Sequence, residues 1–185
     1  AVVLHIGCGL DNRHGRIGMD AEWFDIDFPE VIRERRKHFA EGNGYHMLPA
    51  DMRQEGWKAA VPGGKVIIAM EGVSMYLTAS ERLALLERLS GHFSEVRLLL
   101  DSYTVFAAKA TRYKNPINDV GVTEVYGMDD AKGLAEKTGL SFVAEHDMMP
   151  TTLIAQLDTA ERMVFSNLYA GKTARKLYRI YEFEA

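Results

Sequence analysis

The sequence predicts an α/β fold in which a mostly parallel β-sheet carries helices on both faces. Three observations lead to this prediction. Short apolar runs typical of buried strands recur through residues 1–101, and segments with helical spacing lie between several of them. Near the end of the chain, the segment KLYRIYEF (176–183) alternates its side chains with the two-residue period of a strand. We expect that terminal strand to be antiparallel to its neighbours.

Five strands are expected in the first half of the chain. They are Val2–Ile6, Trp23–Asp27, the segment YHMLPAD that ends near Asp51, Lys65–Glu71 and the segment EVRLLLDS at 95–102. The first strand is an apolar run that ends at a glycine, as is typical of a buried strand. A proline and two glycines at 62–64 separate the fourth strand from the chain before it.

Helices are expected after the second and the fourth strands. The segment PEVIRERRKHFA begins with Pro29, which suits the first position of a helix because its fixed φ is already helical. Its basic run RERRKH (33–38) is expected to form a solvated face. Thr78 and Glu81 form a capping-box pair ahead of a leucine-rich segment, and this pair predicts the start of another helix.

The second half of the chain is less regular. The segment DDAKGLAEKTGL predicts a helix closed by Gly139, and SFVAEHDMM (141–149) predicts a strand. Residues 103–126 show no clean periodicity, so we expect a long excursion over the carboxyl edge of the sheet. Together with residues 148–171, which include a short helix beginning near Asp158, they are interpreted as lid segments on the substrate side.

Composition limits the classes of protein to which the chain can belong. Its 185 residues suffice for a sizeable core, and we interpret residues 1–185 as one domain. The formal net charge of −4 does not favour nucleic-acid binding, and no apolar run reaches the roughly 20 residues of a membrane span. The single cysteine, Cys8, excludes an internal disulfide and suits a reducing compartment, so a cytoplasmic location is expected.

The stretch LHIGCGLDNR (4–13) ends the first strand with a pair of glycines. Gly7 and Gly9 are typical of the turn after the first strand of a nucleotide-binding sheet, and Cys8 between them is expected to pack rather than to act as a nucleophile. The dinucleotide fingerprint also requires a third glycine three residues after the second, where this chain has Asn12. NAD is therefore disfavoured as the ligand, and a tight turn without a ligand is the simpler alternative.

Four acidic residues follow four successive strands of the predicted sheet. They are Asp11, Asp27, Asp51 and Glu71. Because the carboxyl ends of parallel strands line the ligand crevice, we expect these side chains to converge. Converging carboxylates repel a pyrophosphate and suit a ligand with hydroxyls, amines and a positive charge. S-adenosylmethionine has ribose, adenine amine, ammonium and sulfonium groups but no phosphate, so it fits this set better than NAD.

Each acid has a candidate role and a simpler alternative. Asp27 lies 20 residues after Gly7, the interval at which an acid accepts hydrogen bonds from ribose hydroxyls, but it can instead cap the helix that follows. Asp51 and Met52 lie where an adenine would be recognised, although Asp51 can also be a surface acid. Asp11 is expected to cap a helix rather than to contact a ligand.

Three stretches resemble, in order and spacing, the leucine carboxyl methyltransferase family. They are LHIGCGLDNR, WFDIDFPEVIRERR (23–36) and AMEGVSMYLT (69–78), and they resemble in particular its bacterial tetracenomycin-type polyketide O-methyltransferase branch. The resemblance extends from Val2 to about Leu77 and continues loosely at 95–101. It implies the Rossmann-like fold of class I S-adenosylmethionine-dependent methyltransferases, a mostly parallel sheet of seven strands in the order 3-2-1-4-5-7-6 with an antiparallel last strand.

Applied to this sequence, the resemblance implies a set of residues that bind the methyl donor. The turn of Gly7, Cys8 and Gly9 passes beneath the methionine part of S-adenosylmethionine, Asp27 holds the ribose, Asp51 and Met52 flank the adenine, and Glu71 approaches the methionine end. Members of the family have a segment before the first strand that contacts the carboxylate of the donor. Because this chain begins directly on the first strand, at Ala1, we expect it to lack that segment.

The resemblance also implies an O-methyltransferase that acts on a hydroxyl or carboxyl group of a small, polyketide-like molecule. A protein C-terminal carboxylate as acceptor and a truncated, non-catalytic S-adenosylmethionine-binding domain remain alternatives. Tyr76, Ser102 and Tyr103 follow the fourth and fifth strands and are candidates to border the acceptor, although Tyr76 is more simply a packed aromatic at a helix entry. His5 is expected to be a core histidine. No side chain stands out as a catalytic base, and no histidine pair has metal-ligand spacing, so no metal is expected.

Overall fold

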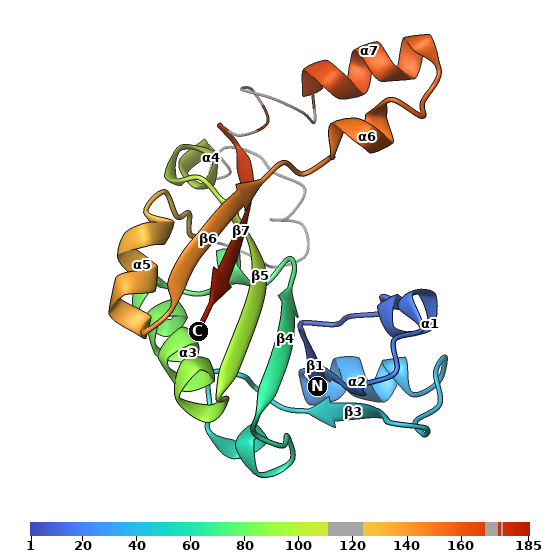
Figure 1. The fold of residues 1–185 in the computed structure, drawn as a ribbon, viewed down its shortest axis with the longest axis vertical. Helices are drawn as coiled ribbons and strands as arrows, with labels where there is room; N and C mark the ends of the chain where they lie inside the picture. Colours follow the sequence, from blue (N-terminus) through green and yellow to red (C-terminus); the bar gives the residue numbers. More distant parts are fainter. Residues whose placement is uncertain (111–123, 169–173, 175) are drawn as a thin grey trace.

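The computed structural model describes residues 1–110, 124–168, 174 and 176–185, and its centre is a seven-stranded sheet (Figure 1). The strands are β1 (Val2–Ile6), β2 (Glu22–Asp27), β3 (Tyr45–Pro49), β4 (Lys65–Met70), β5 (Glu95–Tyr103), β6 (Ser141–His146) and β7 (Tyr178–Glu184). Their order is β3-β2-β1-β4-β5-β7-β6, and β7 runs antiparallel to both of its neighbours while the other pairs are parallel. The predicted α/β sheet, its strand order and its antiparallel last strand are confirmed.

The helices of the described residues are mostly short. They are α1 (Arg13–Ile17), α2 (Pro29–Arg35), α3 (Ala79–His92), α4 (Val105–Ala110), α5 (Ala131–Thr138), α6 (Thr151–Ile154) and α7 (Thr159–Leu168), with the 3₁₀ turns η1 (Gly56–Ala59) and η2 (Ser74–Tyr76). The predicted capping box starts α3, since Thr78 Oγ1 accepts from the Glu81 N–H at 3.2 Å and Glu81 Oε2 from the Thr78 N–H at 2.9 Å. In these residues no helix is long and apolar enough to cross a bilayer.

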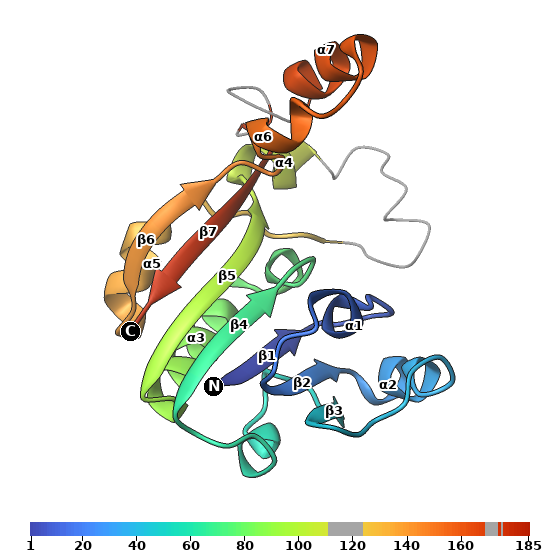
Figure 2. The ribbon, with the colours of Figure 1, turned by 45° about the vertical axis from the view of Figure 1, so that its right-hand side comes forward.

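One face of the sheet is covered by α3 and α5 and forms the main core (Figures 1 and 2). Because side chains alternate along a strand, the even-numbered residues of β1, β4 and β5 all point to this face. Leu4, Ile68 and Leu98 are fully buried there, in one cluster with Leu86 and Leu89 of α3. This cluster fixes the strands that carry the candidate site.

Among the described residues, the opposite face is covered over β1, β2 and β3, where α2 packs. The buried cluster on this side consists of Val3, Cys8, Trp23, Ile32, Tyr45 and Met47. Farther along the sheet, Ile67 of β4 and Leu99 of β5 remain 37% and 39% exposed in the part of the chain that the structure describes. The two faces of β4 and β5 are therefore covered very unequally.

The carboxyl edge of the sheet brings together the acids that follow successive strands. Positions 6, 26 and 70 are in register across β1, β2 and β4. The next positions along the three strands, occupied by Gly7, Asp27 and Glu71, therefore lie side by side at this edge. Figure 1 shows α6 and α7, which follow β6, extending from the same end of the molecule.

The basic run at 33–38 is not a purely solvated face, and this expectation was wrong for one residue. Arg35 is only 1% exposed, whereas Arg33 and Arg36 are exposed. Arg35 lies three positions after the fully buried Ile32, so both side chains fall on the face of α2 that packs on the sheet. A basic residue in a charged run is therefore part of the interior, and its partners are described below.

Several element boundaries differ from the expected ones. The third strand ends at Pro49 rather than near Asp51, because the chain turns after it, with the Gln54 N–H donating to the Asp51 carbonyl at 2.9 Å. The strand β6 ends at His146, before the two methionines at 148–149. Helix α5 ends as predicted, with Gly139 in the left-handed region at φ +72°.

The two segments expected to form lids are described only in part. Residues 105–110 form helix α4, so the expectation of an irregular excursion was wrong at its start. Residues 111–123 and 169–171 lie outside the described residues. The helix expected near Asp158 is α7, which begins at Thr159.

Candidate functional site

The site is built around the tight turn that follows β1. Gly7 has φ +69° and Gly9 has φ +50°, values that favour glycine. A Cβ atom at Gly7 would also lie 2.1 Å from Cγ2 of Val73, in the turn after β4. The Gly7 N–H donates to the Ile26 carbonyl at 2.8 Å, so the turn is attached to β2 as well. Glycine is therefore required here both by the backbone angle and by the close approach of the two turns.

Asp27 stands at the carboxyl end of β2, beside this turn. Its Oδ2 accepts a hydrogen bond from the Gly9 N–H at 2.8 Å, and its Oδ1 accepts one from the Phe28 N–H at 2.8 Å. A carboxylate oxygen accepts about two hydrogen bonds, so each oxygen keeps room for one more donor. The helix-cap alternative was wrong, because Phe28 itself is the N-cap position of α2 and no side chain caps that helix.

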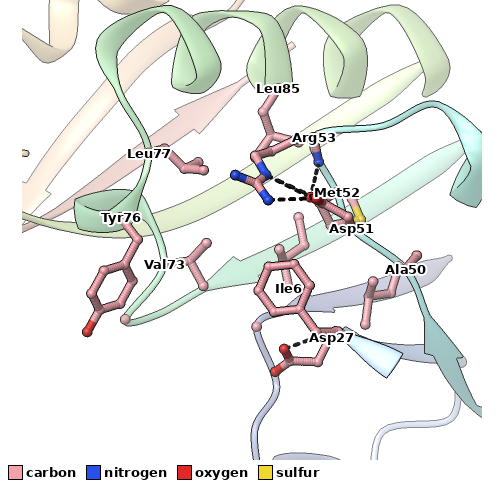
Figure 3. A pocket seen from close by; sticks show the side chains of 14 residues that line it. Ile6, Asp27, Ala50, Asp51, Met52, Arg53, Val73, Tyr76, Leu77 and Leu85 are labelled. Atoms are coloured by element: carbon pink, nitrogen blue, oxygen red, sulfur yellow. Dashed lines mark hydrogen bonds and ion pairs between the residues drawn. The ribbon is translucent and has the colours of Figure 1, made fainter. Parts of the chain in front are cut away.

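An apolar pocket of about 280 Å³ opens between Asp27 and the start of α3 (Figure 3). It is lined by Ile6, Gly7, Ile26, Asp27, Phe28, Ala50, Asp51, Met52, Arg53, Gly72, Val73, Tyr76, Leu77 and Leu85. In Figure 3, Asp27 lies at one end of the pocket and the Arg53–Asp51 pair lies at the other. The structure thus brings five of the predicted site residues to one pocket, namely Gly7, Asp27, Asp51, Met52 and Tyr76.

Asp51 is not a free acceptor in this structure. The Arg53 Nη2 donates to Asp51 Oδ2 at 2.8 Å, and the Arg53 backbone N–H donates to Oδ1 at 2.9 Å. Hydrogen bonding from Arg53 holds the pKa of the Asp51 carboxyl below its usual range. The guanidinium of Arg53 also lies 5.9 Å from the ring centroid of Phe28, and so reaches across this end of the pocket. Arg53, which the sequence analysis missed, is therefore the partner that occupies the Asp51 carboxylate in this structure.

Glu71 lies outside the apolar pocket, in the adjoining cavity along the turn after β1. It is 65% exposed and forms an ion pair with Arg13 of α1. Asp11 pairs with Arg13 at 3.1 Å and with Arg16 at 2.9 Å. The expectation that Asp11 caps a helix was wrong, because the N-cap residue of α1 is the next residue, Asn12, and no side chain caps this helix.

Cys8 belongs to the buried cluster beneath the turn, and it also lines the cavity in which Glu71 lies. It is 1% exposed, and burial together with the nearby Asp25 carboxylate raises the pKa of its thiol to about 12. The thiol is therefore neutral at physiological pH. This placement agrees with the expectation that Cys8 is a packing residue.

Beneath the turn lies a buried polar network centred on Asp25, which the sequence analysis did not identify. Asp25 is fully buried and accepts from Trp23 Nε1 at 2.8 Å and from Tyr45 Oη at 2.6 Å. It also contacts His5 Nδ1 at 3.0 Å and forms an ion pair with Arg35. His5 is thus a core histidine with a partner, as predicted. The only sequence signal for the network was an acid inside an otherwise apolar strand.

The three residues expected to border an acceptor lie in different environments. Tyr76 is 46% exposed, so its interpretation as a packed aromatic was wrong, and Figure 3 shows its ring pointing away from Asp27. Ser102 is fully buried and donates its hydroxyl to the Tyr103 carbonyl at 3.0 Å, so it faces the interior rather than a substrate. Tyr103 is half-buried and packs edge-on against Tyr178, with 5.5 Å between ring centroids.

A second buried carboxyl group, Asp101, lies at the end of β5. Its Oδ2 accepts from the Gly72 N–H at 2.8 Å, and Tyr178 Oη also donates to it. Burial raises the pKa of Asp101 despite these hydrogen bonds. The sequence analysis missed Asp101 as a site residue, although it comes directly after the apolar residues Leu98–Leu100 of β5. Within the described ranges, no three His, Cys, Asp or Glu side chains are grouped so that they could share a metal ion.

The chain is similar to known methyltransferases. Residues 1–90 match the model of the family described as leucine carboxyl methyltransferase. The chain is 27% identical to the tetracenomycin polyketide synthesis O-methyltransferase TcmP of Streptomyces glaucescens, over 99% of this chain and 69% of that protein. It is also 27% identical to the S-adenosyl-L-methionine-dependent methyltransferase dpfgK of Gibberella zeae, over 72% of this chain and 50% of that protein.

Solved structures with the same fold include S-adenosylmethionine-binding proteins of low sequence identity. The complex of LepI with S-adenosylmethionine has a TM-score of 0.65 at 13% identity, over 99% of this chain and 42% of LepI. The mitomycin 7-O-methyltransferase MmcR has a TM-score of 0.58 at 17% identity, over 99% and 48% of the two chains. The magnesium protoporphyrin IX methyltransferase of Synechocystis PCC 6803 with bound S-adenosylhomocysteine has a TM-score of 0.56 at 17% identity, over 98% and 73%.

Proposed function

Because residues 1–90 match the model of the leucine carboxyl methyltransferase family, we propose that this chain is an S-adenosylmethionine-dependent O-methyltransferase. The observation that carries the proposal is the Asp27 carboxylate. It is held by the glycine turn at one end of an apolar pocket, and each of its oxygens can accept one further hydrogen bond. That arrangement suits the two adjacent hydroxyls of a ribose.

The charges around the turn support a donor without phosphate. The Gly9 N–H, which a pyrophosphate would need, is already donated to Asp27. In the cavity on the other side of the turn, Asp11 and Glu71 are paired with Arg13 and Arg16, which line the same cavity. Beside the turn itself the charge is the Asp27 carboxylate, which attracts a sulfonium or ammonium group and repels a pyrophosphate.

The apolar part of the pocket supports an adenine. Ala50, Met52, Leu77 and Leu85 line it with methyl and methylene groups that can sandwich a flat ring. Asp51 lies at the end of this slot, where it can accept from the exocyclic amine once Arg53 moves aside. Glu71 and the glycine turn are assigned to the methionine end of the donor.

Catalysis by this chain is then mainly positioning. Bound S-adenosylmethionine supplies an electrophilic methyl group, and the turn and Asp27 fix its direction. Holding both reactants in line contributes roughly 7 to 11 kcal/mol to a transfer of this type. A carboxylate acceptor needs no proton removed, whereas a hydroxyl acceptor needs a base or must arrive ionised.

We assign the acceptor to a small molecule with a hydroxyl or carboxyl group, of polyketide-like character. The support is the likeness to TcmP, which acts in tetracenomycin polyketide synthesis and is matched over nearly the whole of this chain. Tyr76 and Tyr103, at the carboxyl ends of β4 and β5, are assigned to its border. The segments around α4, α6 and α7 are assigned as the acceptor-side lid.

The donor assignment is tested by calorimetry with S-adenosylhomocysteine and with NAD. We expect the chain to bind the first and not the second, and we expect Asp27→Ala to abolish that binding because the ribose loses its acceptors. Asp20→Ala, an exposed acid outside the pocket, serves as the matched control and should bind normally. Failure of the wild-type chain to bind S-adenosylhomocysteine, or equal binding of NAD, would contradict the proposal.

The acceptor assignment is tested with tritiated S-adenosylmethionine and a panel of phenolic and carboxylic aromatic compounds. Transfer to a panel member is the expected result, and treatment with base distinguishes a labile methyl ester from a stable ether. Transfer only to the C-terminal carboxylate of a peptide would replace the small-molecule acceptor by a protein one. No transfer to any acceptor, with donor binding intact, would indicate a non-catalytic donor-binding domain.

A further inference from the structure

Gly9 is held at both of its backbone polar groups, which belong to the two peptide units that flank its Cα. Its N–H donates to Asp27 Oδ2 at 2.8 Å, on the side of the pocket. Its carbonyl accepts from Arg35 Nη1 at 3.0 Å, on the side of the buried network. Arg35 Nη2 donates at 2.7 Å to a second carbonyl of the same turn, that of Asp11. One guanidinium therefore fixes two carbonyls of the glycine turn.

Arg35 is itself fixed by the interior. Its side chain is 1% exposed, its Nε donates to Tyr45 Oη at 3.0 Å, and Tyr45 Oη donates to Asp25 Oδ2 at 2.6 Å. The ion pair between Arg35 and Asp25 completes a closed set of contacts. The guanidinium is planar and its donors have fixed directions, so it transmits this geometry to the carbonyls that it holds.

The charges of this pair are compatible with its burial. Burial acts to raise the pKa of Asp25, but hydrogen bonds from His5, Tyr45 and Trp23 and the charge of Arg35 lower it below the usual range. Asp25 is therefore ionised and balances the guanidinium. Neither group can move toward solvent without leaving the other as an unpaired buried charge. The network is therefore a rigid support for the turn.

We propose that Arg35 is a positioning residue of the donor site. By holding the carbonyls of Gly9 and Asp11 it restrains the backbone of the turn, and with it the preceding peptide unit, whose Gly9 N–H orients the Asp27 carboxylate toward the ribose hydroxyls. The inference rests on the proposed function, in which Asp27 binds the ribose. It adds that a side chain buried behind the turn determines how well the two hydroxyls are recognised.

The test compares S-adenosylhomocysteine with its 2′-deoxy analogue, which lacks one of the two hydroxyls. We expect the wild-type chain to prefer the ribose ligand by about tenfold, the equivalent of one hydrogen bond to a charged group. Arg35→Lys keeps the charge beside Asp25 but cannot hold both carbonyls. We expect its ratio of dissociation constants for the two ligands to fall toward one, with calorimetry on the folded variant as the measurement.

Arg36→Lys is the matched control, because Arg36 follows Arg35 on the chain and also donates to a backbone carbonyl, that of Met47 at 2.9 Å in β3. It should leave the ratio of the two dissociation constants unchanged. If Arg35→Lys does not fold, Tyr45→Phe removes only the hydroxyl that joins Arg35 to Asp25, and we expect a smaller fall in the ratio.

The outcomes separate this inference from the proposed function. A wild-type chain that binds neither ligand overturns the proposed function and this role with it. A wild-type chain that prefers the ribose ligand, together with a folded Arg35→Lys variant that weakens both ligands equally or neither, overturns only the role of Arg35. An equal loss for both ligands is the result expected of a purely structural arginine.

Discussion

Two buried carboxyl groups, Asp25 in β2 and Asp101 in β5, differ in what surrounds them. Asp25 is paired with a buried arginine and three further side chains, and its pKa lies below the usual range. Asp101 accepts from the neutral Gly72 N–H and the Tyr178 hydroxyl, and burial raises its pKa. The same residue type at the same depth is therefore a fixed charge on one side of β1 and a protonation-sensitive group on the other.

The difference reflects the two halves of the proposed site. Beneath the donor pocket, a compensated charge can hold the glycine turn in one place over a wide range of pH. Asp101 and Tyr178, together with Glu71, line a cavity on the face of the sheet that is only partly covered. The charge beneath the donor pocket is thus expected to be insensitive to pH, whereas the charge beside this cavity is not.

The largest change in stability is expected when the carboxylate of Asp25 is removed. Asp25→Ala leaves Arg35 as an uncompensated buried charge, so we expect the free energy of unfolding to fall by about 3 to 5 kcal/mol. Denaturant unfolding of the variant measures the change. Asp20→Ala, an exposed acid, should stay within about 0.5 kcal/mol of the wild type, and a similarly mild effect of Asp25→Ala would refute the role of the buried pair.

Acid unfolding tests whether the pKa of Asp25 is lowered in the folded state. A carboxyl whose folded-state pKa is lowered stabilises the fold above its unfolded pKa of about 4, and that contribution is lost as the pH falls through the folded-state pKa. We expect the melting temperature of the wild type to fall in that range, below about pH 4. Asp25→Asn should be less stable at neutral pH but should lose less on acidification, and parallel curves for the two proteins would argue against a lowered pKa.

Asp101→Asn tests the opposite shift, the raised pKa of the carboxyl group in β5. The amide oxygen can still accept from Gly72 and Tyr178, so we expect a cost of about 1 kcal/mol at low pH. Because the folded-state pKa of Asp101 is raised, the wild type loses stability as the pH rises through it, and the variant has no such loss. The difference in melting temperature should therefore narrow between acidic and neutral pH, whereas a widening difference would contradict the raised pKa.

Arg53→Ala extends the comparison to a carboxylate at the surface, and its effect should be the smallest. Arg53 is 45% exposed, and an exposed ion pair contributes only about 0.2 to 1 kcal/mol. Since the variant frees Asp51 for a ligand amine, we expect S-adenosylhomocysteine to bind up to about fivefold more tightly, as measured by calorimetry. Lys58→Ala removes an ion pair with Glu55 outside the pocket and serves as the control. Weaker binding by Arg53→Ala would show that Arg53 itself contacts the ligand.

Much of the fold could be predicted from local patterns in the sequence. Apolar runs and the capping box at Thr78 depend on contacts within a few residues, and these elements occur where they were expected. The segment around α4 was not recognised, because its short run of alanines and one lysine carries little periodicity. The ends of two strands were predicted a few residues too late: β3 ends at Pro49 rather than near Asp51, and β6 ends at His146 rather than at Met149. The hydrogen bonds of the neighbouring strand decide these boundaries.

The candidate site could be predicted less completely. The glycines and acids at strand ends were identified because their spacing is set by the topology of a parallel sheet. Arg35 and Asp101 were missed as partners, because each acts on a residue in a different element. Arg53 was missed although it lies only two positions after its partner Asp51. Arg35 in particular lies in a run of charged residues that is typical of a solvated face. Only the packing of α2 on the sheet shows that this arginine is buried.

A Cβ at position 7 would lie only 2.1 Å from Cγ2 of Val73, and this has a consequence for how the site can vary. Val73 also lines the apolar pocket, so one methyl group limits both the turn and the space for a ligand. A smaller residue at position 73 would widen the adenine slot and, at the same time, remove the steric part of the requirement for glycine at position 7. The remaining strain of φ +69° would still be present. Positions 7 and 73 therefore form a linked pair through which pocket volume and turn geometry would have to change together.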